Sequence, residues 1–306
     1  MSTRDDLTTY TSDRALSEQR ASDGGLYIPY RIPKLSDEEL RRVREMDTKE
    51  IVMFVARRYL RLPDGFLEAD GIPVRINAVG NRIAVCDIFP ERCGSFRGYT
   101  NMVADCLCPD GQGNTGLLSV CLRIGAIAAA ITAYDRLDEM HTNCRTDITA
   151  VAGDLFGPMS AFIAREMGFP VGDILCCCNE NSGFWELLHH GAFRTDQVAA
   201  HTGIPEADIA VPDGLECLIA LCCGREEVAR YLEAVRSGRP YMPGEEGLEG
   251  LRSAFRATVV TDLRHILGAY ISRGIPIRAG TALALTGLMN YRTGNGPARR
   301  TLVLAE

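Results

Sequence analysis

Residues 147–178 read DITAVAGDLFGPMSAFIAREMGFPVGDILCCC, and this stretch decides the fold class. Residues 147–152 and 171–178 are short apolar runs of the kind that forms buried strands. Between them, residues 158–167 indicate a helix that stops before Gly168, a residue type that commonly ends helices. A strand, a helix and a second strand in this order favour an α/β sheet with parallel pairing.

The rest of the chain continues this alternation. The sequence predicts helices over residues 36–44, 48–60, 115–137, 184–190, 215–223, 225–237 and most of 248–273, and strands over 74–78, 81–89 and 301–305. Residues 237–250 are rich in glycine and proline and are expected to form a long surface loop. The predicted class is an α/β protein with a mostly parallel sheet flanked by helices.

Composition and charge exclude some classes of function. The 306 residues carry 33 Lys and Arg against 40 Asp and Glu, a net charge of −7, which argues against a nucleic-acid binder. The N-terminus has no apolar core behind a basic flank, so no secretory signal is expected. The apolar stretch 117–134 contains Arg123 and falls short of a membrane span, so it is interpreted as a buried helix. We therefore expect a cytoplasmic protein without nucleic acid or membrane as a partner.

The 12 cysteines and the paired histidines do not predict a metal site. The close cysteine groups at 106–108, 176–178 and 222–223 lack the paired spacing of a zinc site. We interpret the cysteines as reduced, small buried residues in a reducing compartment. His189 and His190 are interpreted as a helix-surface pair, because adjacent helical residues do not face one ligand. No metal is predicted.

Lysine is nearly absent from this chain. Lys34 and Lys49 are the only two, so all other basic side chains among the 33 are arginines. Schiff-base chemistry needs an amine that can lose its proton, which arginine does not do. Ser36 and Asp47 are predicted helix caps that precede charged turns, so both lysines are expected on solvated helix surface. An enzyme that uses a lysine Schiff base would have to employ one of these two residues.

Three groups of residues near the N-terminus form a recognisable series. Residues 10–12 read YTS, residues 23–29 read DGGLYIP, and residues 35–40 read LSDEEL. This series resembles the N-terminal signature of the threonine synthases. The resemblance implies the large-domain fold of the pyridoxal-phosphate enzymes of fold type II, which tryptophan synthase β shares. It also implies pyridoxal phosphate as the cofactor and a carbon-oxygen lyase activity.

A second match concerns the cofactor lysine of that family. Residues 87–89 (DIF) together with Phe96 resemble the family segment ELFHGPTLAFKDF. Aligned on Phe89 and Phe96, the lysine position holds Arg97, and the following aspartate position holds Gly98. Arginine keeps the positive charge but cannot form an aldimine. By this resemblance, Arg97 is a non-catalytic residue at the catalytic position.

A third match concerns the family's phosphate loop. Residues 151–157 (VAGDLFG) resemble VPTGNFG, and residues 179–181 (NEN) resemble part of ATNEND. The resemblance places these residues at the cofactor: Gly153, Asp154, Phe156, Gly157, Asn179 and Asn181. Asp154 stands where the family offers backbone amides to a dianionic phosphate, and like charges at short range oppose binding. The sequence therefore predicts a degenerate loop and no covalently bound cofactor.

The chain is also short for this family. The interval between Arg97 and residue 151 is shorter than between the matching family motifs, and the chain ends where the family continues into a TAHPAKF-type segment. We predict that the small domain is largely deleted, leaving residues 1–100 as an N-terminal region and residues 101–306 as the α/β core. Residues 111–116 (GQGNTG) fit a dinucleotide motif only weakly and are interpreted as a linker that ends in a helix cap.

Together these observations predict a threonine synthase-like pseudoenzyme. Fold and activity can separate in this way, because function depends on a few site residues. The protein is expected to bind a small anionic metabolite, gripped by Arg97, or a protein partner. A homo-oligomer is the default assembly, with residues 126–134 as the candidate surface. The alternative is an active pyridoxal-phosphate lyase that converts O-phosphohomoserine to threonine, with the lysine placed elsewhere than at residue 97.

Overall fold

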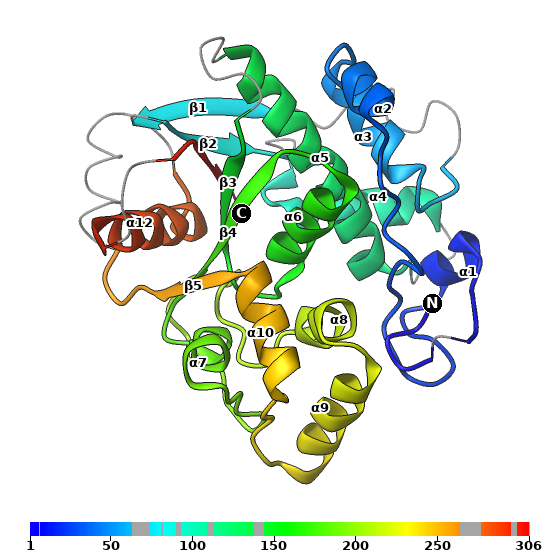
Figure 1. Ribbon diagram of the computed structural model, residues 1–306, viewed down its shortest axis with the longest axis vertical. Coiled ribbons are helices and arrows are strands. Elements are labelled where there is room, and N and C mark those ends of the chain that lie inside the picture. Colours follow the sequence, from blue (N-terminus) through cyan, green and yellow to red (C-terminus); the bar gives the residue numbers. More distant parts are fainter. Residues whose placement is uncertain are drawn as a thin grey trace. The chain divides into compact units, whose positions relative to one another are not determined.

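The computed structural model describes residues 1–5, 7–62, 74–80, 82–89, 93–108, 113–137, 144–263, 277–294 and 299–305 (Figure 1). The chain divides into two compact units. Unit 1 consists of Met1–Ala78, Cys86–Thr146 and Ser160–Gly172, and unit 2 consists of Val79–Val85, Asp147–Met159 and Asp173–Glu306. The predicted division into an N-terminal region of residues 1–100 and an α/β core of residues 101–306 stays a prediction.

Unit 1 is mainly helical. Its described helices are α1 (Ser12–Ser17), α2 (Asp37–Val43), α3 (Thr48–Ala56), α4 (Phe96–Leu107), α5 (Thr115–Leu137) and, from Ser160 on, α6 (Phe156–Met167). Ser36 and Asp47 begin α2 and α3 with capping boxes, in which the cap and the third helical residue bond each other's backbone N–H. Both predicted caps are therefore confirmed.

Helix α5 forms the core of unit 1. It packs on α3, and at Gly125 a Cβ atom would lie 2.8 Å from the Cα of Val52, so the glycine permits a close approach. The 23-residue helix is long and apolar enough to span a membrane, but 83% of its most apolar window is buried. Arg123 is buried with its guanidinium 4.4 Å from the Phe96 ring centroid. The predicted buried helix is confirmed, and its residues 126–134 are core residues apart from the half-buried Ala133.

The sheet belongs mostly to unit 2. In the described chain its strands lie in the order β1 (Arg75–Gly80), β2 (Ile83–Asp87), β6 (Thr301–Leu304), β3 (Thr146–Val151), β4 (Val171–Cys178) and β5 (Arg256–Val259). β3 pairs with β6, and β4 with β5, in parallel. Helix α6 (Phe156–Met167) connects β3 to β4. The predicted α/β class and its strand-helix-strand unit are confirmed.

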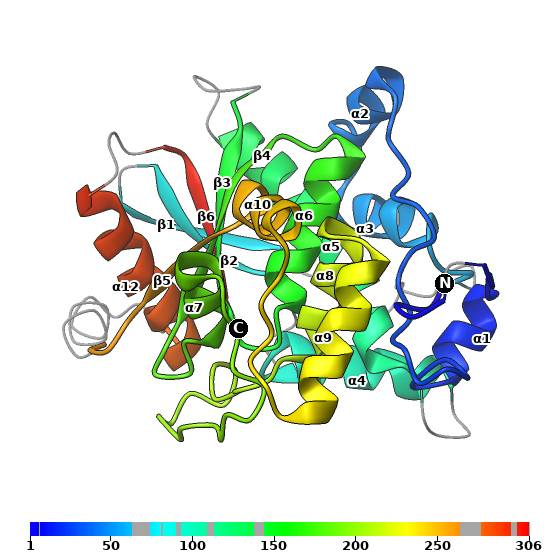
Figure 2. The ribbon, with the colours of Figure 1, turned by 60° about the horizontal axis from the view of Figure 1, so that its bottom comes forward.

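The described part of unit 2 also contains the helices α7 (Gly183–His190), α8 (Asp213–Cys222), α9 (Arg225–Ser237), α10 (Glu245–Ala254) and α12 (Ala279–Gly294). Helix α8 packs against α9 and α10, and Figure 2 shows these three side by side. Helix α12 packs on β5 and β6. The Cys177 thiol lies 3.6 Å from the Ala284 carbonyl oxygen of α12, so the odd-numbered side chains of β4 point toward that helix.

Two local predictions are wrong. Residues 248–273 were expected to be mostly helical, but α10 ends at Ala254 and β5 follows at once. The edge of β4 selects the strand conformation, because residues 256–259 pair with it and Val260 N bonds the Cys178 carbonyl. The loop expected over 237–250 ends early, since α10 begins at Glu245. Residues 264–276 lie outside the described chain.

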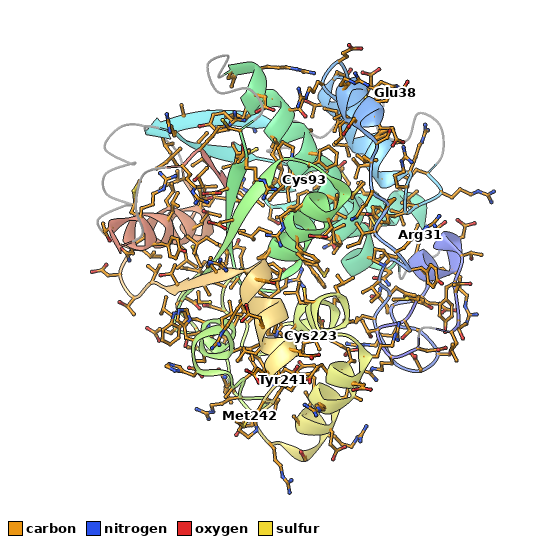
Figure 3. All side chains as sticks on the ribbon, viewed as in Figure 1. Arg31, Glu38, Cys93, Cys223, Tyr241 and Met242 are labelled. Atoms are coloured by element: carbon orange, nitrogen blue, oxygen red, sulfur yellow. The ribbon has the colours of Figure 1, made fainter. Side chains whose placement is uncertain are left out.

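All twelve cysteines are free thiols. Those of β4 are completely or almost completely buried, and burial raises the pKa of Cys178 to about 12. Cys223, labelled with Cys93 in Figure 3, donates a hydrogen bond to the Gly247 carbonyl at 3.2 Å. The interpretation as buried apolar residues is confirmed for β4 and for Cys217 of α8, whereas Cys106 is exposed.

Candidate functional site

The loop of residues 153–157 and the Asn179–Asn181 segment lie at one end of the sheet. The first follows β3 and the second follows β4, which are neighbours in the sheet. Thr146 N bonds the Pro170 carbonyl and Ala152 N bonds the Cys177 carbonyl, so the two strands are parallel. The carboxyl ends of parallel strands are where α/β sheets hold ligands. The structure therefore brings together the site residues predicted within unit 2.

The backbone of the loop is strained at Leu155. Its φ angle is +65°, in the left-handed region that a branched residue rarely adopts. Leu155 N bonds the Ala152 carbonyl at 2.6 Å, and the leucine side chain is 1% exposed. Burial therefore holds the residue in this conformation. The corresponding family sequence has asparagine, which tolerates the left-handed region better.

Two glycines bring other backbone segments against this loop. A Cβ atom on Gly153 would lie 2.1 Å from the Glu206 carbonyl oxygen, and one on Gly214 would lie 2.3 Å from the Asp154 carbonyl oxygen. Gly214 N also donates to that Asp154 oxygen at 3.1 Å. The space beside the loop is thus filled by the protein's own backbone.

The Asp154 side chain bonds the beginning of α6. Its Oδ1 accepts a hydrogen bond from Phe156 N, the first residue of the helix, at 2.9 Å. The amides at a helix N-terminus attract anions because the helix dipole is positive there. In this chain an internal carboxylate already bonds the first of these amides.

Asn179 is buried and fully bonded to other protein groups. Its Nδ2 donates to Thr202 Oγ1 at 2.9 Å and to Asp208 Oδ1 at 2.8 Å. Its Oδ1 accepts from the backbone N of Asn181 at 2.9 Å. Both donors and the acceptor are therefore used within the protein, and this side chain ties β4 to the segment 202–208.

Asn181 extends the same network. Its Nδ2 donates to the Ala200 carbonyl at 3.0 Å, and its Oδ1 accepts from Ala200 N at 2.8 Å. Burial alone would raise the pKa of Asp208, but the hydrogen bonds from Thr202, Asn179 and Gly203 outweigh it and hold that pKa below its usual range. The contacts thus give both asparagines a role in positioning the 200–208 segment.

Arg97 belongs to unit 1. It is the second residue of α4, is exposed, and makes no hydrogen bond or ion pair in the described part of the chain. Ser95 caps the helix by accepting from Gly98 N at 3.0 Å. A Cβ atom on Gly98 would lie 2.2 Å from the Cys93 carbonyl oxygen, so this turn requires glycine. Lys34 is exposed, and Lys49 is half-buried on α3.

The histidine pair and the glycine motif lie apart from the loop at residues 153–157 in the sequence. His189 and His190 are exposed at the end of α7, and the Trp185 ring stacks on His189 at 4.6 Å, which confirms the surface pair. Over the described ranges, no three His, Cys, Asp or Glu residues are placed to share a metal ion. Asn114 Oδ1 accepts from Leu117 N and caps α5, as predicted for the end of the glycine motif. Residues 111, 112, 141 and 265 lie outside the described chain.

Comparisons with known proteins identify the fold. Residues 1–70 match the family described as threonine synthase N terminus. The chain is also similar to the structure of pyridoxal phosphate-bound threonine synthase from Brucella melitensis, with a TM-score of 0.78 and 16% identity over 100% of this chain and 87% of that one. This chain has the threonine synthase fold. The yeast threonine synthase gives 0.79 at 15% identity over 100% and 86%, and the Escherichia coli enzyme gives 0.73 at 12% over 97% and 85%. No curated protein matches the chain in sequence.

The loop after β3 does not fit the phosphate of pyridoxal phosphate. The first amide of α6 is bonded to Asp154, and Leu155 N is bonded to Ala152. Two unit charges of like sign about 4 Å apart repel by about 4 kcal/mol at an effective dielectric constant of about 20. Unit 2 also contains no lysine, because Lys34 and Lys49 both lie in unit 1. The deletion of most of the small domain stays a prediction.

Proposed function

We propose that this chain is a non-catalytic member of the threonine synthase fold that acts by binding. The observation that carries the proposal is the hydrogen bond from Phe156 N to the Asp154 carboxylate. It satisfies the first amide of the helix internally and puts a negative charge in the loop that the resemblance assigns to the cofactor phosphate. The replacement of the family lysine by Arg97, inferred from the sequence resemblance, supports the same proposal.

The molecule bound is proposed to be a small anionic metabolite or a protein partner, and a second copy of the chain is the default partner. The Arg97 guanidinium is exposed and suits carboxylate or phosphate groups, which it can grip through paired hydrogen bonds. A screen of carboxylated and phosphorylated metabolites by thermal shift should find a stabiliser. At about 100 times its dissociation constant, that ligand would add about 2.7 kcal/mol. Arg97→Ala should abolish the shift.

Borohydride reduction tests the catalytic part of the proposal. The full chain is incubated with pyridoxal phosphate, its absorption spectrum is recorded, and it is reduced and mapped by peptide. We expect no internal-aldimine band and no stoichiometric pyridoxyl group on Lys34 or Lys49, the only lysines. A stoichiometric pyridoxyl lysine together with turnover of O-phosphohomoserine would instead support the active lyase.

Substitutions at residue 154 test the internal anion directly. Asp154→Gly removes the carboxylate, so inorganic phosphate should stabilise this variant more than the wild type in a thermal shift assay. Asp154→Asn is the matched control, because asparagine keeps a side-chain acceptor for Phe156 N and removes only the charge. It should respond to phosphate less than the glycine variant does. Equal responses of all three proteins would contradict the role of Asp154.

Arg97→Lys alone should not produce threonine-forming activity.

A further inference from the structure

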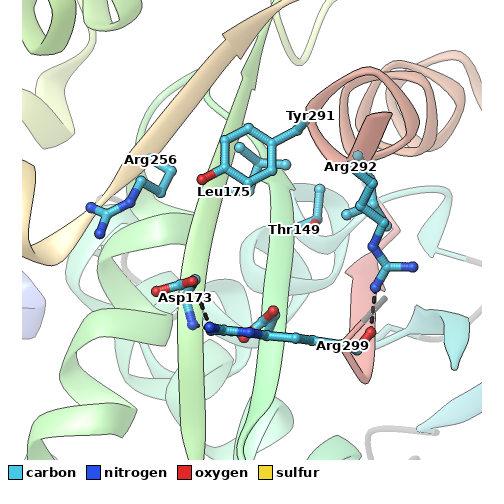
Figure 4. A pocket seen from close by; sticks show the side chains of 9 residues that line it. Thr149, Asp173, Leu175, Arg256, Tyr291, Arg292 and Arg299 are labelled. Atoms are coloured by element: carbon cyan, nitrogen blue, oxygen red, sulfur yellow. Dashed lines mark hydrogen bonds and ion pairs between the residues drawn. The ribbon is translucent and has the colours of Figure 1, made fainter. Parts of the chain in front are cut away.

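A pocket lies toward the opposite end of the same strands, against α12 (Figure 4). Its polar lining comes from Asp147 and Thr149 of β3, Asp173 of β4, Arg256 of β5, Arg292 of α12, and Arg299 before β6. These residues all belong to unit 2. Asp147, Asp173 and Arg256 stand at or near the amino ends of their strands, so the pocket is distinct from the loop at residues 153–157.

Thr149 contributes a buried hydroxyl group that faces this pocket. The residue is 0% exposed, and within the described residues its Oγ1 has no hydrogen-bond partner. Figure 4 shows it on the side of the sheet that carries Tyr291 and Arg292. Buried polar groups in native proteins are almost always bonded, and an unbonded one calls for an explanation. A polar ligand in the pocket would supply the missing partner.

The two aspartates in the pocket have different environments. Asp173 Oδ2 is paired with the Arg299 guanidinium at 3.0 Å, which Figure 4 shows across the pocket. Asp147 Oδ1 accepts only from Asp173 N, at 2.9 Å, and Asp147 makes no ion pair with any described residue. Burial raises the pKa of Asp147 in spite of that hydrogen bond. The charges of Arg299 and Arg292 act to lower that pKa, but neither arginine forms an ion pair with Asp147 among the described residues, so its carboxylate can accept a ligand's ammonium group.

The pocket also contains a cation without a carboxylate. Arg256 Nη1 donates to the backbone carbonyls of Arg252 and Phe255, which are neutral, and Arg256 makes no ion pair among the described residues. Arg256 stands on β5 and Asp147 on β3, with β4 between them. Besides the Asp173–Arg299 ion pair, the pocket lining therefore carries the carboxylate of Asp147 and the guanidinium groups of Arg256 and Arg292.

We propose that this pocket binds a small zwitterion of the α-amino acid class, with its ammonium group at Asp147, its carboxylate toward Arg256, and a hydrogen bond to Thr149. The pocket volume of about 90 Å³ limits the size of the ligand. A cavity needs about 15 Å³ to hold one water molecule, so this pocket has room for about six waters or for a ligand of about six non-hydrogen atoms. L-Alanine has this size and both charges. The inference does not rest on the state of the loop at residues 153–157.

The test is calorimetric titration of the full chain with L-alanine, propionate and ethylammonium at constant ionic strength. L-Alanine should bind saturably with one site per chain, and each singly charged analogue should bind at least about tenfold more weakly, because one charged contact is lost. Equal binding of propionate would make this a simple anion site and overturn the proposal. So would the absence of saturable heat with L-alanine.

Matched variants locate the binding. Thr149→Val should weaken L-alanine binding about tenfold, and so should Asp147→Asn, which retains an acceptor for Asp173 N. Thr146→Val is the control, because Thr146 is equally buried and its hydroxyl is equally unbonded among described residues, but it points to the other face of β3. It should bind like the wild type. Unchanged binding in Thr149→Val, or equal losses in both threonine variants, would overturn the assignment.

Discussion

The two ends of β3 and β4 differ in how the protein treats its own polar groups. At the carboxyl end, Asp154 bonds the terminus of α6, and Asn179 has both donors and its acceptor occupied. Toward the amino end, the Thr149 hydroxyl has no hydrogen-bond partner and Asp147 has no ion pair among the described residues. A polar site satisfied from within gives stability, whereas one left unsatisfied costs stability and favours a ligand. The proposed amino-acid pocket thus lies at the opposite end from the one where α/β folds usually hold ligands.

The largest effect expected from this contrast is at Asn179. Asn179→Ala should lower the free energy of unfolding by about 3 kcal/mol, since it removes several buried hydrogen bonds, including those that its amide donates to Asp208 and Thr202. Urea denaturation measures this change. The control Asn290→Ala, at an exposed position of α12, should change it by less than about 0.5 kcal/mol. Equal effects would show that the network is not a stabilising unit.

A threonine-to-valine substitution should change the free energy of unfolding in opposite directions at the two ends. Thr202→Val removes a hydroxyl that accepts from Asn179 and donates to Asp208 at 2.7 Å, so it should destabilise the protein by about 1 to 2 kcal/mol. Thr149→Val removes a buried hydroxyl without a described partner, so it should stabilise the free protein by about 1 kcal/mol. Urea denaturation of both variants without ligand decides the point. Destabilisation by both would end the distinction between the two regions.

The sequence predicted the parts of the fold that local pattern controls. Helix α5 and strand β4 have the predicted bounds, because a long, mostly apolar run and a bounded strand signal fix them. The capping residues Ser36 and Asp47 were also predicted from local sequence, because serine and aspartate before a charged helical turn are typical caps. β5 was missed because pairing with β4 overrides its local preference.

The sequence predicted the candidate site less completely. The resemblance located Gly153 and Asp154, but it could not reveal that Asp154 bonds α6 or that Glu206 lies against Gly153. Thr202 and Asp208 were missed, because they reach Asn179 from 23 and 29 residues away and carry no motif. The pocket beside Thr149 gave no signal either, because it forms only when β3, β4, β5 and α12 meet.

The smallest effect expected is a difference in the pH dependence of stability. The pKa of Asp208 is lowered in the folded protein, so its contribution is present above its ordinary value of 3.8 and is lost as the pH falls through the folded pKa. The pKa of Asp147 is raised, so ionisation costs stability as the pH rises above 3.8. Relative to wild type, Asp208→Asn should therefore lose stability with rising pH, and Asp147→Asn should gain it. Urea midpoints from pH 3 to 7 measure both, and slopes of the same sign would contradict the contrast.

Equilibrium dialysis of the full chain against pyridoxal phosphate tests the central claim, that the carboxyl end of the sheet is closed to this cofactor. It detects covalent and noncovalent binding alike and needs no assumption about which lysine is used. We predict no saturable retention in the wild type, because the Asp154 carboxylate holds the terminus of α6. Saturable binding of one pyridoxal phosphate per chain would contradict the account.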